Sequence, residues 1–107
     1  MQGEALKGHL DLLLLAALEA QPAHGYAVVE RLRQRSGGAF DLPEGTLYPA
    51  LHRLEHGGWV TSEWSDETGR RRRVYALTDA GRKRLRERQR EWRAFAVAVN
   101  HVVEGMA

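Results

Sequence analysis

Three consecutive arginines, Arg70, Arg71 and Arg72, follow Gly69 and are the residues of this chain best suited to bind an anion. Guanidinium groups pair with phosphate oxygens, and they also enter narrow minor grooves of DNA, where negative potential is concentrated. Turn-forming residues precede the run and a β-branched and aromatic segment follows it, so we expect the arginines at the tip of a β-hairpin. The alternative is a hairpin tip that is only solvated. Arg73 is a weaker candidate, because the second strand should have begun there.

Two histidines, His52 and His56, stand four residues apart on a predicted helix, which is a spacing that metal ligands use. No carboxylate or third histidine accompanies them, so the set is incomplete for a zinc site. The chain has no cysteine, and the sequence shows no nucleophile–base pair and no phosphate-binding glycine loop. We therefore expect no metal, no cofactor and no enzymatic activity.

Charge is separated along the chain, although the net charge is only +2. Residues 70–93 contain 11 Lys or Arg and 3 Asp or Glu, whereas the rest of the chain contains 5 basic and 11 acidic residues. A basic region on an acidic body suggests a surface that faces a polyanion. Much of the basic charge falls in the last predicted helix, where Glu87 and Glu91 can pair with it, so a solvated helix face is the simpler interpretation there.

Size and hydropathy restrict the class of protein. A chain of 107 residues forms one domain, or one domain with an appendage, and gains stability from oligomerisation. The longest apolar run, from Leu12 to Leu18, is too short to span a bilayer, and the N-terminus lacks the basic flank of a secretory signal. We expect a soluble, cytoplasmic protein that has no membrane partner.

The hydrophobic pattern predicts three helices in the first half of the chain. The first spans about residues 6–19 and is apolar on nearly all sides, so it needs several packing partners. The second spans about residues 24–35 and is ended by Gly37 and Gly38.

For the third helix, Leu47, Leu51 and Leu54 mark the buried face. Thr46 is the expected N-cap, because this start places Pro49 in the first turn, where no backbone donor is lost. A bent helix that begins earlier is the alternative.

A β-hairpin and a long helix are predicted for the second half of the chain. Residues 59–64 and 71–77 have strand composition, and residues 65–69 have turn composition. Thr78 caps the last helix, which is expected to reach about 26 residues because no helix breaker follows Gly81 before the glycine at 105.

Three helices followed by a basic hairpin are typical of a winged helix-turn-helix. A helix fits the major groove of DNA, and a hairpin beside it reaches the backbone or the minor groove. The expected fold class is mainly α with a small β-hairpin. Residues 1–77 form the winged helix-turn-helix DNA-binding domain, and residues 78–107 form a C-terminal dimerisation helix.

Several motifs occur in one order along nearly the whole chain. They are Leu6–Asp11, His24–Tyr26, Gly45–Glu55, Gly69–Thr78, Gly81–Arg82, Trp92 and Phe95. With these motifs the sequence resembles the PadR-type transcriptional regulators, and its length resembles their short subfamily with one C-terminal helix. The resemblance implies a homodimeric repressor that binds double-stranded DNA at an inverted-repeat operator with ATGT and ACAT half-sites.

The resemblance also implies that the third helix contacts DNA. The expected contact residues on that helix are Thr46, Tyr48, Pro49 and Arg53, which join Arg70, Arg71 and Arg72 of the hairpin. The alternatives are that Thr46 is only a cap and that Arg53 pairs with Glu55 or Glu30. A protein–protein adaptor that no longer binds DNA is the second hypothesis for the whole chain, and the basic hairpin argues against it.

The last helix carries an apolar stripe that the preceding domain cannot cover, so we expect a second copy of the chain to cover it. The expected interface residues are Leu14, Trp92, Phe95, Val99, Val102, Val103 and Met106. The resemblance further implies that Trp92 and its symmetry mate can flank a cavity, with Phe95 nearby. A planar hydrophobic effector bound there would release the DNA. Ordinary dimer packing is the alternative for both residues.

Overall fold

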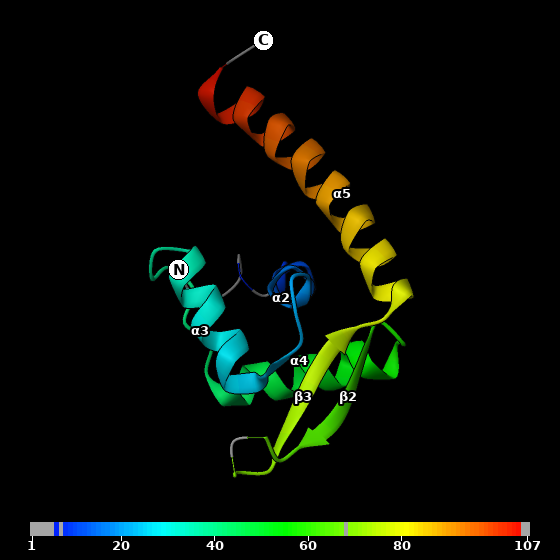
Figure 1. The fold of residues 1–107 in the computed structure, drawn as a ribbon. Helices are drawn as coiled ribbons and strands as arrows, with labels where there is room; N and C mark the ends of the chain where they lie inside the picture. Colours follow the sequence, from blue (N-terminus) through cyan, green and yellow to red (C-terminus); the bar gives the residue numbers. More distant parts are fainter. Residues whose placement is uncertain (1–5, 7, 68, 106–107) are drawn as a thin grey trace.

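The computed structural model describes residues 6, 8–67 and 69–105, in which helices and one small antiparallel sheet surround a central helix (Figure 1). Helix α2 (Leu10–Leu18) lies in the middle, and α3 (Gly25–Arg35), α4 (Glu44–His56) and the sheet enclose it. Helix α5 (Asp79–Glu104) projects beyond this body, so the molecule measures 55 × 28 × 21 Å. No described helix is both long enough and apolar enough to cross a membrane.

Helix α2 is the centre of the core because its apolar surface extends around most of the helix. It packs against α3, α4, α5 and a strand of the sheet, so the expected set of several partners is confirmed. The buried residues of this helix are Leu10, Leu14, Leu15, Ala17 and Leu18. The regular helix begins at Leu10 rather than at Leu6, because His9 has a non-helical conformation with φ −123° and ψ 10°.

Helix α4 begins earlier than the sequence predicts, and the expectation that Thr46 is its N-cap is wrong. The N-cap is Pro43, whose carbonyl accepts hydrogen bonds from the backbone N–H groups of Thr46 and Leu47, both at 3.0 Å. Pro49 therefore lies inside the helix and cannot donate to the carbonyl of Gly45. Gly45 is exposed, so water can hydrate that carbonyl, and the early start is tolerated.

The sheet has three strands in the order β1–β3–β2, one more than the predicted hairpin. Strands β2 (Val60–Ser65) and β3 (Arg72–Leu77) form the hairpin, in agreement with the predicted strands to within one residue. Strand β1 (Ala23–His24) pairs with β3 and places His24 opposite Val74. This short pairing joins the start of α3 to the base of the basic hairpin.

Helix α5 has the predicted cap and length. Thr78 Oγ1 accepts a hydrogen bond from the N–H of Gly81 at 3.0 Å and donates one to the carbonyl of Gly58 at 2.7 Å. The helix ends at Gly105, which has a φ of +66°. A Cβ on Gly81 would lie 1.9 Å from the carbonyl oxygen of Trp59, so glycine is required for this close approach. The first turn of α5 is thus fixed to the segment between α4 and β2.

Candidate nucleic-acid interface

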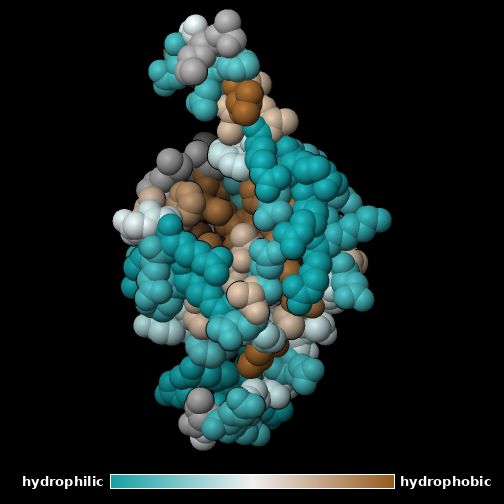
Figure 2. All heavy atoms as spheres, turned by 45° about the horizontal axis from the view of Figure 1, so that its top comes forward, coloured by the Kyte–Doolittle hydropathy of each residue, from teal (hydrophilic) through white to brown (hydrophobic). Residues whose placement is uncertain are grey.

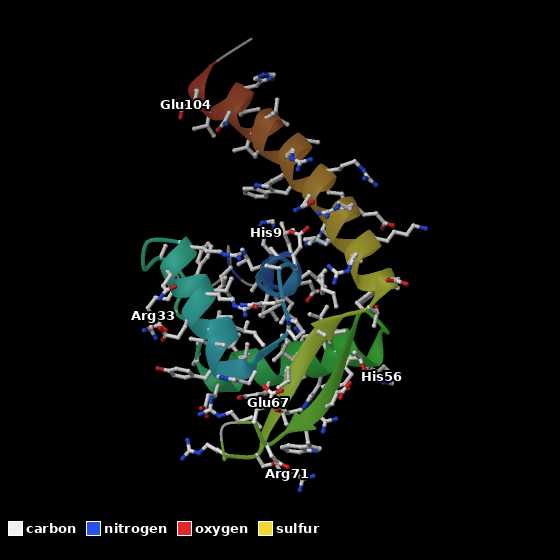
Figure 3. All side chains as sticks on the ribbon, viewed as in Figure 1. His9, Arg33, His56, Glu67, Arg71 and Glu104 are labelled. Carbon is white, nitrogen blue, oxygen red and sulfur yellow. The ribbon has the colours of Figure 1, made fainter. Side chains whose placement is uncertain are left out.

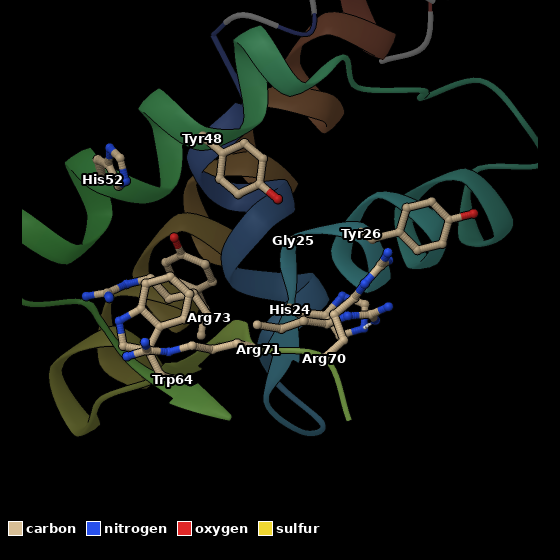
Figure 4. Close-up of a pocket in the computed structure, with 11 residues that line it drawn as sticks. His24, Gly25, Tyr26, Tyr48, His52, Trp64, Arg70, Arg71 and Arg73 are labelled. Carbon is tan, nitrogen blue, oxygen red and sulfur yellow. Dashed lines mark hydrogen bonds between the residues drawn. The ribbon is translucent and has the colours of Figure 1, made fainter. Parts of the chain in front are cut away.

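An open groove of about 590 Å³ lies where α3, α4 and the hairpin converge (Figure 4). Its residues come from the start of α3, the exposed face of α4 and the hairpin. They are His24, Gly25, Tyr26, Tyr48, His52, Trp64, Arg70, Arg71, Arg72, Arg73 and Tyr75. Four of these side chains are arginines, and the described lining contains no acidic residue. The groove is therefore suited to a polyanionic ligand.

Helix α4 turns its polar face to solvent and its leucines to the core. Leu47, Leu51 and Leu54 are buried, as predicted. The predicted contact residues Thr46, Tyr48, Pro49 and Arg53 are exposed. Of these four, the structure places only Tyr48 in the groove. His52 lines the groove as well; its position on the third helix is also expected to face DNA, although it is not one of the four named contacts.

Arg53 has none of the ion pairs that were the alternative to DNA contact. Within the described residues, Glu55 contacts Ser62 and Arg73, and Glu30 pairs with Arg33 at 3.0 Å. Arg53 makes no ion pair with that part of the chain, which leaves its guanidinium available on the surface of α4.

Tyr48 reaches from α4 to the first residue of α3 (Figure 4). A Cβ on Gly25 would lie 2.5 Å from the Tyr48 hydroxyl and 2.8 Å from the neighbouring ring carbon. The absence of a side chain at Gly25 therefore makes room for the ring. The Tyr48 ring therefore lies against the start of α3, at the wall of the groove.

The predicted hairpin arginines occupy three different environments. Arg70 makes no hydrogen bond, ion pair or ring contact with the described residues. The Arg71 guanidinium lies 4.6 Å from the centre of the Trp64 ring, and Arg71 marks the hairpin tip in Figure 3. Arg72 Nη1 lies 2.8 Å from Nε2 of His24.

His24 connects the helix α3 terminus to the hairpin. Nδ1 of the ring is 3.3 Å from the backbone N–H of Ala27, and Nε2 receives the Arg72 contact. Burial lowers the pKa of His24 below its ordinary value, and the positive charges of Arg72 and then Arg31 lower it further. The ring is therefore held in its neutral form beside a cluster of cations.

Besides His52, the groove residues outside the predicted contact set are His24, Gly25, Tyr26, Trp64, Arg73 and Tyr75. Tyr26 is exposed and stacks on His24 at a ring distance of 6.4 Å. His24 and Tyr26 belong to the His-Gly-Tyr motif already noted in the sequence, which was the signal available for them. Trp64 had no such signal, because its place beside Arg71 depends on the strand register.

A second cavity, of about 560 Å³, lies between the start of α2 and the middle of α5. It is lined mainly by apolar side chains from these helices and the loop after α3. The lining residues are Leu6, His9, Leu12, Leu13, Phe40, Trp92 and Phe95. The His9 ring meets the Trp92 ring edge-on at 5.1 Å, and His9 points from α2 toward α5 in Figure 3. Figure 2 shows hydrophobic atoms in a hollow bordered by hydrophilic ones.

The residues expected at a dimer interface divide into two groups. Trp92, Phe95, Val99, Val102 and Val103 are exposed on α5. Leu14 is fully buried in the core of one chain, so its assignment to the interface is wrong: it has no surface to offer a partner. Met106 lies outside the described residues.

The arginines of α5 largely pair within the chain, as a solvated helix face would. Arg84 pairs with Glu87 at 3.5 Å and Arg88 with Glu91 at 3.1 Å, while Arg86 reaches Glu19 at 2.6 Å. In the parts of the chain that the structure describes, no three His, Cys, Asp or Glu side chains cluster as metal ligands would.

Known proteins are similar to this chain in sequence and in fold. The family model described as "Transcriptional regulator PadR-like family" matches residues 14–87. The chain is 43% identical over 67 residues to the transcriptional regulator Rv3488 of Mycobacterium tuberculosis, a match that covers 63% of this chain and 60% of that protein.

Solved structures of other proteins superpose on this chain along almost its full length. A transcriptional regulator from Clostridium thermocellum superposes with a TM-score of 0.87 at 29% identity, covering 94% of this chain and 99% of that one. A PadR family transcription regulator from Clostridium difficile gives a TM-score of 0.80 at 35% identity, covering 90% and 99%. The chain described here belongs to the PadR-like family of transcriptional regulators.

Proposed function

We propose that this regulator represses transcription by binding an inverted-repeat operator through the groove formed by α3, α4 and the hairpin. The observation that carries the proposal is the convergence of Tyr48 with Arg70, Arg71 and Arg72 on one open surface without an acidic residue in its described lining. The exposed side chains of α4 would contact base edges in the major groove, and the arginines would contact phosphates or the minor groove.

A homodimer would place two such grooves on one operator. Beyond Leu85, no described residue of α5 is buried, although the helix continues to Glu104. Val102 is 83% exposed and Val103 is 70% exposed, which is costly for adjacent apolar side chains unless a partner covers them. A second copy with the same stripe would supply that cover, and its two-fold axis would match the two-fold symmetry of an inverted repeat.

A planar hydrophobic effector is the proposed signal. Trp92 is 44% exposed and stands at the edge of the cavity between α2 and α5. Aromatic faces favour offset stacking, so a flat ligand could lie against this indole. A ligand that contacts both helices would release DNA if it binds better to a dimer geometry that misplaces the two copies of α4.

The test is fluorescence anisotropy with two duplexes, an inverted repeat of ATGT and ACAT half-sites and a random sequence, over a range of salt concentrations. Affinity should fall with salt by about 0.9 log units per log unit of salt for each phosphate contact. Tyr48→Ala should lower the ratio of operator to random affinity by at least about fivefold, because base contacts carry sequence information. Arg53→Ala tests the other exposed basic candidate on the same helix, which does not line the groove.

The adaptor hypothesis gives the opposite result. A wild-type chain that shows no salt-dependent affinity for either duplex would contradict DNA binding through this groove. Equal losses on both duplexes from Tyr48→Ala would show that Tyr48 does not read sequence.

A further inference from the structure

Trp64 is a large aromatic residue in an unusual place for a small protein. It lies near the end of β2 with 54% of its surface exposed. Val60 on the same face of β2 is buried, as are Tyr75 and Leu77 on the paired strand β3, whereas Trp64 lies beyond the part of this face that the core covers. Burial in the core therefore does not account for a tryptophan at this position.

The exposed indole lies beside two guanidinium groups. Arg71 is 4.6 Å and Arg73 is 5.3 Å from the centre of the Trp64 ring, both within the range of cation–π attraction (Figure 4). Arg73 is also the direct partner of Trp64 in the β2–β3 register. The ring thus connects an arginine of the strand to an arginine of the hairpin tip.

Arg73 is anchored to α4. Its Nε donates to Ser62 Oγ at 2.8 Å, and Ser62 Oγ donates to Glu55 Oε2 at 2.6 Å. In addition, Arg73 Nη2 forms an ion pair with the same carboxylate oxygen of Glu55, at a distance of 3.9 Å. A continuous set of contacts therefore runs from Glu55 on α4 through Arg73 and Trp64 to Arg71.

We propose that Trp64 is a positioning residue, which holds the Arg71 guanidinium against the wall of the groove so that it can meet a DNA phosphate. The inference rests on the proposed DNA binding and adds a residue through which one of its contacts acts. An exposed arginine side chain without a contact in the protein loses rotamer entropy when it binds a phosphate. Stacking on Trp64 already restricts the Arg71 side chain in the free protein, so less entropy is lost when DNA binds. Arg70 provides the contrast, because it has no partner in the described chain.

A double-mutant cycle tests this role on a short random-sequence duplex. Trp64→Thr removes the ring while keeping a residue with high strand propensity, and we expect about a two- to fivefold loss of affinity. In an Arg71→Ala background the same substitution should have almost no effect, because the arginine that it positions is absent. Trp64→Phe, which keeps an aromatic face, should retain most of the affinity.

Arg70→Ala is the matched control. Trp64→Thr should cost as much affinity in that background as in the wild type, since Arg70 does not contact the ring. Trp64→Val repeats the cycle with an apolar β-branched side chain, so that a folding failure of one variant leaves the other informative. Melting curves of each variant show which ones fold.

Two outcomes overturn the inference while leaving DNA binding intact. If Trp64→Thr weakens binding equally with and without Arg71, the indole contacts DNA itself or supports the hairpin as a whole. If Trp64→Thr has no effect in the wild type, Arg71 needs no positioning. Absence of salt-dependent binding by the wild type would instead contradict the proposed function.

Discussion

Two hydrogen-bond donors approach the ring of His24, and only an unprotonated ring can accept from either of them. Both the Arg72 side chain and the Ala27 N–H are donors, and they approach opposite nitrogens of the imidazole. A neutral ring has one free lone pair, so each tautomer satisfies one donor, and a protonated ring satisfies neither. Burial, Arg72 and Arg31 lower the pKa of His24 in agreement with this geometry.

Acidification should therefore weaken the fold. Between the ordinary histidine pKa of about 6.5 and the lower folded value, the unfolded chain binds more protons than the folded chain, so stability falls as pH falls through this window. Melting temperatures measured from about pH 7.5 to 5 should drop less steeply for His24→Asn, because this variant lacks the titrating ring. Asparagine can still cap α3, so the variant should fold. His56→Asn, on the exposed end of α4, should retain the wild-type slope.

DNA affinity should respond to pH in the opposite direction. Phosphates near Arg72 offset the positive potential that disfavours a charged ring, so DNA favours protonation of His24 and binding takes up a proton. The charged and titratable groups around His24 in the groove and on α3 are Arg31, Arg70, Arg71, Arg72, Arg73, Tyr26, Tyr48, Tyr75 and His52. The carboxylates Glu63 and Glu67 line a neighbouring hollow that also includes His24. Identical pH profiles of wild type and His24→Asn, for both melting and affinity, would show that this ring does not contribute.

Individual residues differ in how far the sequence could predict their surroundings. The hairpin arginines stand out by type and by their place after Gly69, and Tyr48 by the motif of the third helix. The contact between Arg72 and His24 spans 48 positions and depends on the two-residue strand β1, which is too short to leave a hydrophobic pattern. Leu14 shows the reverse error, because a helix apolar on most sides does not reveal which side faces a partner.

Among the elements, α5 has the least intrachain cover. Only Gly81 and Leu85 are buried in this helix. Trp92, Phe95, Val99, Val102 and Val103 follow one another at helical spacing, so they form one stripe. The stripe was visible in the sequence, because a helix that long carries several repeats of the pattern.

Charges in this stripe should prevent dimerisation. Val99→Asp combined with Val102→Asp would bury unpaired carboxylates, at a cost of several kcal/mol in the dimer. Sedimentation should then show a monomer, and operator affinity should collapse because each half-site is bound separately. Val97→Asp is the matched control, because Val97 lies on the opposite side of the same helix and is exposed. A double variant that remains dimeric would contradict this interface.

Element boundaries were predicted less well than element types. The start of α4 was misplaced because Pro49 was assumed to need the first turn, whereas an exposed carbonyl at Gly45 makes an internal proline tolerable. Helix α2 was predicted four residues too long at its start, since Leu6 continues the apolar pattern although His9 leaves the helical conformation. Local backbone conformation, rather than hydrophobicity, decides both boundaries.

At the scale of the molecule, the groove between α3, α4 and the hairpin lies far from the end of α5. Arg71 and Glu104 mark opposite ends of the structure in Figure 3, and the longest dimension is 55 Å. The apolar cavity lies between them, where α5 passes the start of α2. The proposed effector would therefore contact α5 between the groove and the exposed end of the helix.

Tryptophan fluorescence should report such a ligand. Planar aromatic compounds should quench the wild-type protein, and Trp92→Ala should lose that quenching, because a stacked ligand needs the indole face. Trp64→Ala should retain the quenching, because Trp64 lies beside Arg71 on the hairpin and does not line this cavity. The same quenching in a dimeric Trp92→Ala variant would show that Trp92 does not bind the ligand. The alternative role of Trp92, ordinary packing in the dimer interface, would then be favoured.

The close approach of Gly81 to the Trp59 carbonyl fixes the first turn of the helix that would hold the partner to the body that would hold the DNA. In the proposed dimer, the length of α5 would therefore set the distance between the two DNA-binding bodies and thus the spacing of the half-sites. One inserted residue would rotate the distal stripe by about 100° and turn it away from the partner. Seven inserted residues would restore the face to within about 20° and lengthen the arm by about 10 Å. In the proposed dimer, the half-site spacing could thus change with insertions of near-whole helical turns in α5, and not with single residues.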